Sequence, residues 1–210
     1  MNAAWLWMVW LGLLGYAFTL APPEQPDTLD LIQRLVRFQV AGMNPLIVAL
    51  FNLMGVWPGI YAAILLTDGR GQKIPAWPFV AGSFALGAFA LLPYLALRRP
   101  YREWHGSVPW LLRLWNSRFL GAIWLVLTVG FLGYGLSQGS WPEWWQAFQT
   151  SRFIHVMSLD FLLLSLLFPL VLWDDMARRR LNPHPWFALV SALPLVGSAL
   201  YLTLRPKLPD

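Results

Sequence analysis

Apolar runs separated by short polar segments make up most of the chain, and six of these runs are long enough to cross a bilayer. A membrane core requires about 20 consecutive apolar residues in a helical conformation. The runs cover residues 4–20, 45–66, 77–97, 119–136, 153–173 and 186–204. The hydrophobic pattern therefore predicts an all-α polytopic membrane protein with six transmembrane helices.

Two shorter amphipathic segments interrupt this pattern. The first covers residues 27–41, where Asp27 is placed to cap a helix and Asp30 falls in its first turn. The second starts at Ser140, with Glu143 three residues later. Both segments are expected to form short helices that lie at the membrane interface. An ordinary polar loop fits the second segment equally well.

The second half of the chain repeats the pattern of the first. A displacement of 107 residues superposes five pairs of identical or similar residues, namely Asp68/Asp175, Lys73/Arg180, Pro78/Pro185, Tyr94/Tyr201 and Arg98/Arg205. We therefore expect two related three-span halves, residues 1–105 and 106–210. Because three is an odd number of crossings, this 3+3 internal repeat is expected to be inverted, with short interfacial helices in each half.

Composition supports a membrane protein and narrows the chemistry. Hydrophobic residues make up 58% of the chain and charged residues 12%, whereas a typical soluble domain carries about 25% charged residues. The net charge of +5 comes from arginines in the turns between apolar runs, which is typical of membrane topology and argues against a nucleic-acid partner. Cysteine is absent, which excludes disulfides and thiolate metal sites.

The distribution of Lys and Arg predicts a topology for the six spans. One side would hold both termini together with Arg70, Lys73, Arg152, Arg205 and Lys207. Because cytoplasmic loops are enriched in Lys and Arg, the termini are expected in the lumen or periplasm, and the richer side in the cytoplasm. That richer side would hold Arg34, Arg37, Arg98, Arg99, Arg102, Arg113, Arg118, Arg178, Arg179 and Arg180.

Asp160 is the one carboxylate expected at membrane depth. It follows the start of the fifth run by about seven residues, which corresponds to roughly 10 Å at 1.5 Å per residue. Such a group faces protein or a cavity rather than lipid, so we consider a polar site of Asp160, Asn52 and His155. Asn52 precedes Leu53, which the repeat places opposite Asp160. A structural hydrogen bond between helices is the alternative.

No catalytic constellation or metal site is visible in the sequence. His105 and His184 lie in loops, so His155 lacks a second histidine for a haem. No cofactor is predicted, although a single contact to chlorophyll or carotenoid stays open. Basic residues at the ends of the third and fifth runs, Arg98, Arg99, Arg102, Arg178, Arg179 and Arg180, could contact anionic lipid or dock a partner. Asp174 and Asp175 offer ion pairs to Arg178 and Arg179 as the alternative.

Two families share features with the chain. The stretches 52–58, 68–71, 75–79, 151–153, 158–161 and 173–176 resemble an uncharacterised multi-span membrane protein family of cyanobacteria and chloroplasts. Separately, each half is similar to a small three-span bacterial domain of unknown function that is catalogued with membrane terpene cyclases. That domain has an intramembrane Asp like Asp160, an acid followed by basic residues like Asp175 and Arg178, and an end like residues 202–205. The first half departs from it by lacking the Asp.

These resemblances imply different functions. The first implies a thylakoid protein of accessory or assembly function, which would dock against other integral membrane proteins, with photosystem subunits as suspected partners. The second implies an isoprenoid- or lipid-handling membrane enzyme. An inverted repeat would suit a small transporter as a third class. Membrane lipids are expected to surround the protein in every case.

Overall fold

The computed structural model describes residues 3–99 and 109–208, and the regular elements in these ranges are all helical. This confirms the predicted all-α class. The elements are α1 (Ala4–Thr19), α2 (Thr28–Val36), α3 (Pro45–Asp68), the 3-10 helix η1 (Gly69–Gly71), α4 (Trp77–Leu86), α5 (Ala88–Leu97), α6 (Trp110–Trp115), α7 (Arg118–Gln138), α8 (Trp141–Thr150), α9 (Arg152–Arg178), α10 (Pro183–Ala192) and α11 (Pro194–Leu204).

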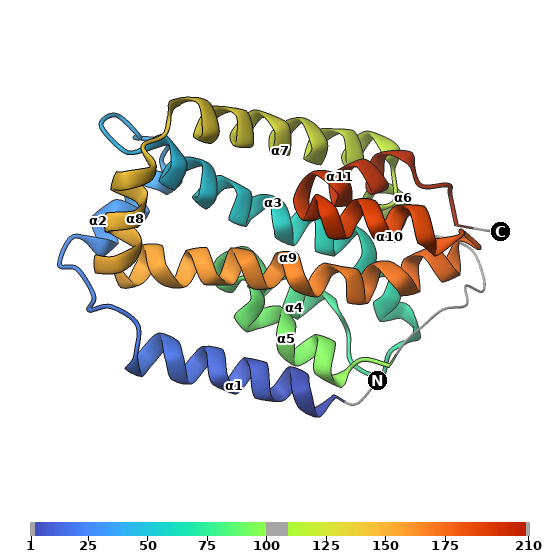
Figure 1. Ribbon diagram of the computed structural model, residues 1–210. Coiled ribbons are helices and arrows are strands. Elements are labelled where there is room, and N and C mark those ends of the chain that lie inside the picture. Colours follow the sequence, from blue (N-terminus) through green and yellow to red (C-terminus); the bar gives the residue numbers. More distant parts are fainter. Residues whose placement is uncertain (1–2, 100–108, 209–210) are drawn as a thin grey trace.

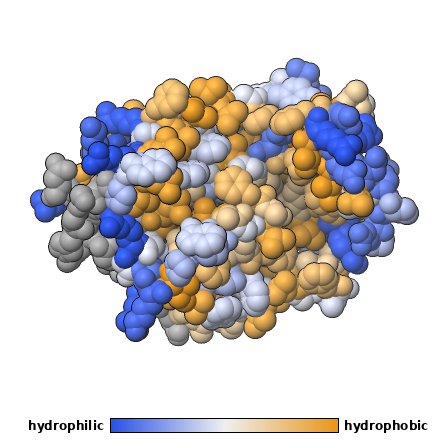
Figure 2. Space-filling view, turned by 180° about the vertical axis from the view of Figure 1, so that it is seen from behind, coloured by the Kyte–Doolittle hydropathy of each residue, from blue (hydrophilic) through white to orange (hydrophobic). Residues whose placement is uncertain are grey.

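Within the described part of the chain, three helical segments are long and apolar enough to cross a membrane. They are Pro45–Gly71, Arg118–Gln138 and Arg152–Arg178, whereas α1, α4, α5 and α11 are apolar but shorter. On the face shown in Figure 2, hydrophobic residues cover most of the middle, and hydrophilic residues gather at the two ends. This distribution matches a protein that associates with a bilayer.

The third and sixth apolar runs are not single spans, which corrects the prediction of six long transmembrane helices. Residues 77–97 form α4 and α5, and residues 186–204 lie in α10 and α11, so each run folds back on itself as a helical hairpin (Figure 1). At the first turn, Gly87 has a φ of +50°, a conformation that glycine adopts without the strain of a side chain. At the second turn, Pro194 starts α11 and interrupts the hydrogen bonding of α10.

The two interfacial segments both form helices, α2 and α8, and these lie at one end of the molecule (Figure 1). The hydroxyl of Ser140 accepts a hydrogen bond from the Glu143 amide, as the sequence predicts. Asp27 precedes α2 without a side-chain capping bond, so the cap predicted there is wrong. The Thr28 hydroxyl instead donates to the carbonyl of Gln25, which stabilises the turn that leads into α2.

The long helices α3 and α9 lie side by side and run in the same direction (Figure 1). The rings of Phe51 and Phe153 contact each other near the starts of the two helices, with centroids 6.4 Å apart, and Asp68 pairs with Arg178 at their ends at 3.1 Å. Helices α1 and α7 run the opposite way. This contradicts the predicted inversion, which would make α3 and α9 antiparallel. The physical reason lies in the hairpins, because a segment that returns to its starting end adds no crossing.

Both halves share one hydrophobic core around the α3–α9 contact. Trp57 and Tyr61 of α3 pack against Phe168 of α9, with ring centroids 5.5 and 5.4 Å apart. The Tyr61 hydroxyl donates to the Leu164 carbonyl at 2.7 Å, so the buried phenol has a partner. Each hairpin packs against this central pair, α4 and α5 on one side and α10 and α11 on the other.

Candidate functional site: a buried ion cluster and a lateral cavity

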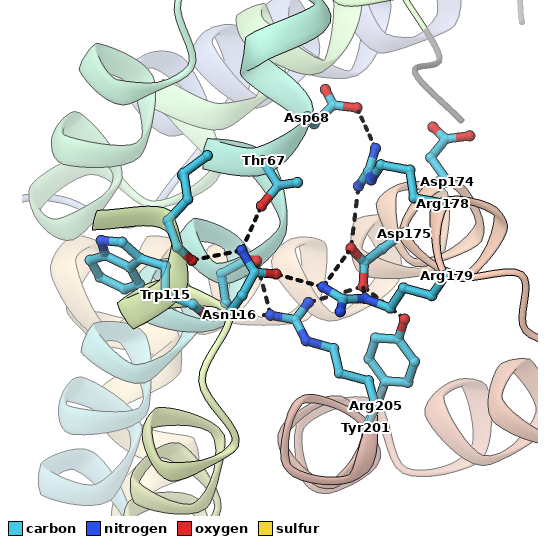
Figure 3. Close-up of polar contacts among 12 residues, drawn as sticks. Thr67, Asp68, Trp115, Asn116, Asp174, Asp175, Arg178, Arg179, Tyr201 and Arg205 are labelled. Carbon is cyan, nitrogen blue, oxygen red and sulfur yellow. Dashed lines mark hydrogen bonds and ion pairs between the residues drawn. The ribbon is translucent and has the colours of Figure 1, made fainter. Parts of the chain in front are cut away.

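A buried network of charges ties the two hairpins to the ends of α3 and α9, and Figure 3 shows the part of it around Asp175. In the first half, Asp68 accepts hydrogen bonds from the Tyr94 hydroxyl and the Arg98 guanidinium, both at 3.1 Å. In the second half, Asp175 accepts from Tyr201 at 2.7 Å and from Arg205 at 2.9 Å. Each member of the second set follows its counterpart by 107 residues. We call the two sets together the ion cluster, and the end of the molecule that holds it the cluster end.

Each arginine of the repeated set also binds the long helix of the other half. Arg98 donates to the Leu170 carbonyl of α9 at 3.3 Å, and Arg205 donates to the Ala63 carbonyl of α3 at 3.1 Å. The two acceptors are themselves 107 residues apart. The exchange is therefore reciprocal, and it joins the halves through equivalent contacts.

Two further arginines complete the cluster. Arg178 bridges Asp68 at 3.1 Å and Asp175 at 3.4 Å, and all three side chains are fully buried. Arg179 donates from Nε to Asp175 at 2.9 Å, which confirms the ion pair predicted four residues apart on one helix. Arg179 also donates to Asn116, whose amide in turn donates to the Thr67 hydroxyl. The network thus extends from α9 to α3 and to the loop before α7.

Arg179 and Arg205 stay charged in this cluster. Burial by itself lowers the pKa of Arg179, but Asp175 beside it raises the pKa, and the net shift is upward. Burial lowers the pKa of Arg205 to about 10, against the opposing effect of Asp175, so Arg205 still carries its charge at neutral pH. A buried charge with good partners is costly to disrupt, because removal of one partner leaves the other uncompensated.

This arrangement corrects the prediction of a basic docking surface. The side chains of Arg98, Arg178 and Arg179 are buried in the cluster and unavailable to a partner. Arg99 and Arg180 are exposed, and Arg102 lies outside the described residues. The cluster is therefore a structural clamp between the hairpins and the long helices.

The distribution of Lys and Arg between the two ends also differs from the prediction. Both ends of the described chain lie at the cluster end (Figure 1), together with the arginine-rich turns, so the predicted separation of termini from these turns is wrong. Among the described residues, the opposite end carries Arg34, Arg37 and Arg152. The cluster end carries Arg70, Lys73, Arg98, Arg99, Arg113, Arg118, Arg178, Arg179, Arg180, Arg205 and Lys207.

A cavity of about 690 Å³ lies in the apolar middle of the molecule, between α1, α3, α9 and the tip of the α4–α5 hairpin. Its walls are mainly aliphatic and aromatic. Exposed Phe18, Phe84 and Leu86 line it on the apolar surface. Exposed Glu24, together with Thr28 and Arg152, lines its outer end near α2. Its volume lies in the range of pockets that hold one small organic ligand.

Asp160 lines this cavity and binds the tip of the hairpin. The carboxylate oxygen Oδ1 accepts a hydrogen bond from the Ala88 amide at 2.8 Å, and a Cβ at Gly87 would overlap Oδ2. Ala88 is the first residue of α5, whose N-terminal amides lack partners within the helix. Asp160 therefore caps α5 as a structural hydrogen-bond acceptor, which is the alternative considered from the sequence, and it lines the cavity as well.

A second, smaller cavity occupies the equivalent place in the other half. Its volume is about 210 Å³, and it lies between α3, α7, α8 and α9. Leu53 stands at the position that corresponds to Asp160, and Pro194 and Leu195 at the start of α11 correspond to Gly87 and Ala88. Six pairs of lining residues, one from each cavity, correspond at the displacement of 107: Leu46/Phe153, Ala49/Val156, Leu50/Met157, Leu53/Asp160, Phe51/Ser158 and Met54/Phe161.

The structure does not bring the three predicted polar residues together. Asn52 donates to the Val48 carbonyl of its own helix at 2.8 Å and does not line the cavity. His155 Nδ1 donates to the Phe148 carbonyl at 2.8 Å, so in the neutral ring Nε2 accepts from the Tyr16 hydroxyl at 2.7 Å. His155 thus ties α1 and α8 to the start of α9. No cluster of three or more metal-binding side chains occurs in the part of the chain that the structure describes.

Sequence reasoning missed the partner of Asp160. Gly87 and Ala88 lie in the middle of an apolar run and carry no polar side chain. Gly87 at the centre of that run, one of its two glycines, was the available signal, since a glycine inside a helical pattern marks a close approach or a turn. Comparison of the chain with protein-family models, with curated proteins and with solved structures found no match.

Proposed function

We propose that this protein is a membrane-embedded binding protein that holds one lipophilic molecule in the cavity around Asp160. The observation that carries the proposal is the cavity itself, which joins apolar walls and a lateral opening to a single carboxylate at its inner end. A bilayer supplies lipophilic molecules from the side, and a pocket with a few polar groups among apolar walls is the usual form of a ligand site.

The access route fits such a ligand better than an aqueous solute. Exposed Phe18, Phe84 and Leu86 form the rim on the apolar surface, and Glu24 and Arg152 line only the outer end of the cavity near α2. A transporter for a polar solute would need a wet path between the two ends of the molecule. Asn52, which a transport path through the centre would use, binds its own helix. Storage, delivery or conversion of an isoprenoid or other lipid, the function implied by the similarity to the terpene-cyclase-associated domain, is consistent with this site.

The experiment fills the cavity and measures what the protein retains. Gly55 lines the cavity, and a Cβ there meets no atom within 4 Å, so Gly55→Phe directs a ring into the space. Gly130 of α7 is equally free of neighbours and lines neither cavity, so Gly130→Phe is the matched control. After purification in mild detergent, lipid extraction and mass spectrometry should find a bound molecule in wild type and Gly130→Phe, and at least tenfold less in Gly55→Phe. Equal retention in all three proteins would contradict the proposal.

A second candidate function is docking against other integral membrane proteins. Gly12 and Gly15 of α1 and Gly130 and Gly133 of α7 are exposed, with no neighbour within 4 Å beyond their own helix. Small residues on an exposed helix face allow close approach of a partner helix. Photosystem subunits in a thylakoid membrane are the partners that the resemblance to the cyanobacterial and chloroplast family implies. Copurification in mild detergent, lost in Gly130→Phe, would support this candidate, and a protein recovered only without partners would exclude it.

We further infer that the chain is a tandem repeat of two similarly oriented halves, with the cluster end in the cytoplasm. The reciprocal contacts of Arg98 and Arg205 support a two-fold relation along the membrane normal, since α3 and α9 run in parallel. The excess of Lys and Arg at the cluster end supports the orientation. In each half, two helices would cross the membrane and the hairpin would enter and leave on the cytoplasmic side.

A further inference from the structure

The two cavities are equivalent in position but differ in their chemistry. The smaller cavity is lined by Leu53, whereas the larger one is lined by Asp160 at the corresponding place. The rest of the corresponding wall is apolar in both, apart from Ser158, whose hydroxyl donates to the Ile154 carbonyl of its own helix. The carboxylate is therefore the feature that distinguishes the larger cavity at its inner end.

The Asp160 carboxylate can accept a further hydrogen bond in addition to the one from the Ala88 amide. A carboxylate offers about four lone-pair positions on two oxygens. One of them is used by the Ala88 amide, which binds Oδ1. Oδ2 lies against Gly87, which has no side chain and also lines the cavity. A hydrogen-bond donor in the cavity can therefore reach the carboxylate without displacing Ala88.

The surroundings of Asp160 select a neutral donor rather than a cation. The N-terminus of α5, a helix of ten residues, points its positive dipole end at the carboxylate through the Ala88 amide. Glu24 and Arg152 both line the same cavity nearer its outer end, so their opposite charges give no preference for either sign of charge there. The dipole of α5 offsets part of the negative charge of the carboxylate and so weakens its attraction for a positively charged head group. A fatty acid is disfavoured as well, because its carboxylate would face that of Asp160.

Asp160 lies deep in the cavity, away from Arg152, so the hydrogen-bond donor of the ligand would lie at the inner end of the cavity. Arg152 and Asp160 are eight residues apart on α9, or about 12 Å along the helix axis. Exposed Phe18 and Phe84 lie at the lateral opening. A hydroxyl at the end of a long apolar chain would reach Asp160 while the chain occupies the apolar walls and the opening.

We propose that the cavity around Asp160 is specific for a long-chain lipophilic alcohol whose hydroxyl donates a hydrogen bond to the Asp160 carboxylate, and that the cavity around Leu53 lacks this head-group site. This inference rests on the proposed function, since it names the ligand class of the same cavity. Hydrogen bonds to charged groups are among the stronger ones in proteins, so loss of the donor should lower the affinity by roughly tenfold or more.

The test compares probes that share a tail and differ only at the head. Hexadecan-1-ol donates a hydrogen bond, 1-methoxyhexadecane does not, and hexadecan-1-amine is cationic. Each is added to the purified full-length protein in mild detergent, and bound probe is counted by native mass spectrometry. Wild type should bind the alcohol at least tenfold more tightly than the ether, and the amine more weakly than the alcohol.

Two variants distinguish the head-group role of Asp160 from its structural one. Asp160→Asn keeps a carbonyl oxygen for the Ala88 amide, so the hairpin tip stays capped, and its amide hydrogen can bind the oxygen of either the alcohol or the ether. The preference for the alcohol should therefore fall to less than about threefold. Asp160→Leu installs the residue found at the corresponding position 53 and should bind both probes at the level of the ether.

The possible outcomes separate the two proposals. If wild type binds neither alcohol nor ether, the proposed function fails and the present inference with it. If it binds both equally, the cavity holds apolar chains but the head-group assignment is wrong. A persistent preference for the alcohol in Asp160→Asn, or tighter binding of the amine, would also overturn the assignment. A preference seen in wild type and lost in Asp160→Asn establishes it.

Discussion

Neutralisation of Asp175 tests the physical account of the ion cluster most directly. Asp175 is fully buried and accepts hydrogen bonds from Tyr201, Arg205, Arg179 and Arg178. In Asp175→Asn the shape is kept and the charge is lost. Arg205 would then retain only the neutral carbonyls of Ala63 and Trp115, so a buried cation loses its counter-charge.

The expected loss is large relative to total stability. Removal of one partner from a buried ion pair costs about 3–5 kcal/mol, and here Arg179 and Arg205 both depend on the carboxylate, so we expect a loss of about 4 kcal/mol. That is a substantial part of the 5–15 kcal/mol that typically separates folded from unfolded protein. The control is Asp30→Asn on the exposed face of α2, which should change stability by less than about 0.5 kcal/mol.

The measurement is the free energy of unfolding from an SDS titration in mixed micelles, followed by tryptophan fluorescence and far-UV circular dichroism. A double-mutant cycle supplies the decisive comparison. Because Arg205→Met removes a cation that Asp175→Asn leaves uncompensated, the double variant should be more stable than the sum of the two losses predicts, by about 1 kcal/mol or more. Additive losses within about 0.5 kcal/mol, or a loss below about 1 kcal/mol for Asp175→Asn alone, would refute the reasoning.

Three further predictions concern the hairpin, the outer helix and the orientation. Gly87→Ala should destabilise the protein by about 2 kcal/mol or more in the same titration, because its φ is +50° and a Cβ there would overlap Asp160. The control Gly15→Ala should be neutral or slightly stabilising, and equal effects of the two variants would contradict the account of the turn. Tyr16→Phe should cost about 1 kcal/mol through loss of the hydrogen bond to His155, and an equal loss in Tyr134→Phe of α7 would show that the bond is not responsible. In this cysteine-free chain, a membrane-impermeant maleimide should label Asp30→Cys in intact cells and Lys207→Cys only after lysis; the reverse pattern would overturn the proposed orientation.

Helix positions followed from the sequence because each helix is defined locally. The helices α3, α7 and α8 carry their start signals in the residue just before each helix: the side chains of Asn44, Ser117 and Ser140 each accept a backbone hydrogen bond at the helix N-terminus. The break within residues 77–97 was missed because one long helix and two short antiparallel helices have the same hydropathy. The length of each run therefore led to the prediction of one span where the structure has a hairpin. Each half was then assigned three membrane crossings, an odd number, and this led to the predicted inversion of the second half.

The candidate site was predictable only in part. Asp160 stands out in any hydropathy profile, since a charge in an apolar run needs a partner. That partner is the backbone amide of Ala88, which lies 72 residues away in sequence. A backbone amide is present at almost every residue, so nothing in the sequence marks this one as the partner. Similarly, the arginines at residues 98, 178 and 179 read as surface charges, because burial depends on which carboxylates the folded helices bring within reach.

The sequence by itself determined the apolar helices, the matching residues at a displacement of 107 and the presence of one carboxylate within an apolar run. All of these depend on residue identity and on the short-range geometry of a helix. The tertiary structure decided the common direction of α3 and α9, the burial of the arginines and the cavity at Asp160. These depend on which distant surfaces pack together, and the hairpin turns at Gly87 and Pro194 control that packing. One glycine and one proline thus changed the topology without changing the hydrophobicity of the runs that contain them.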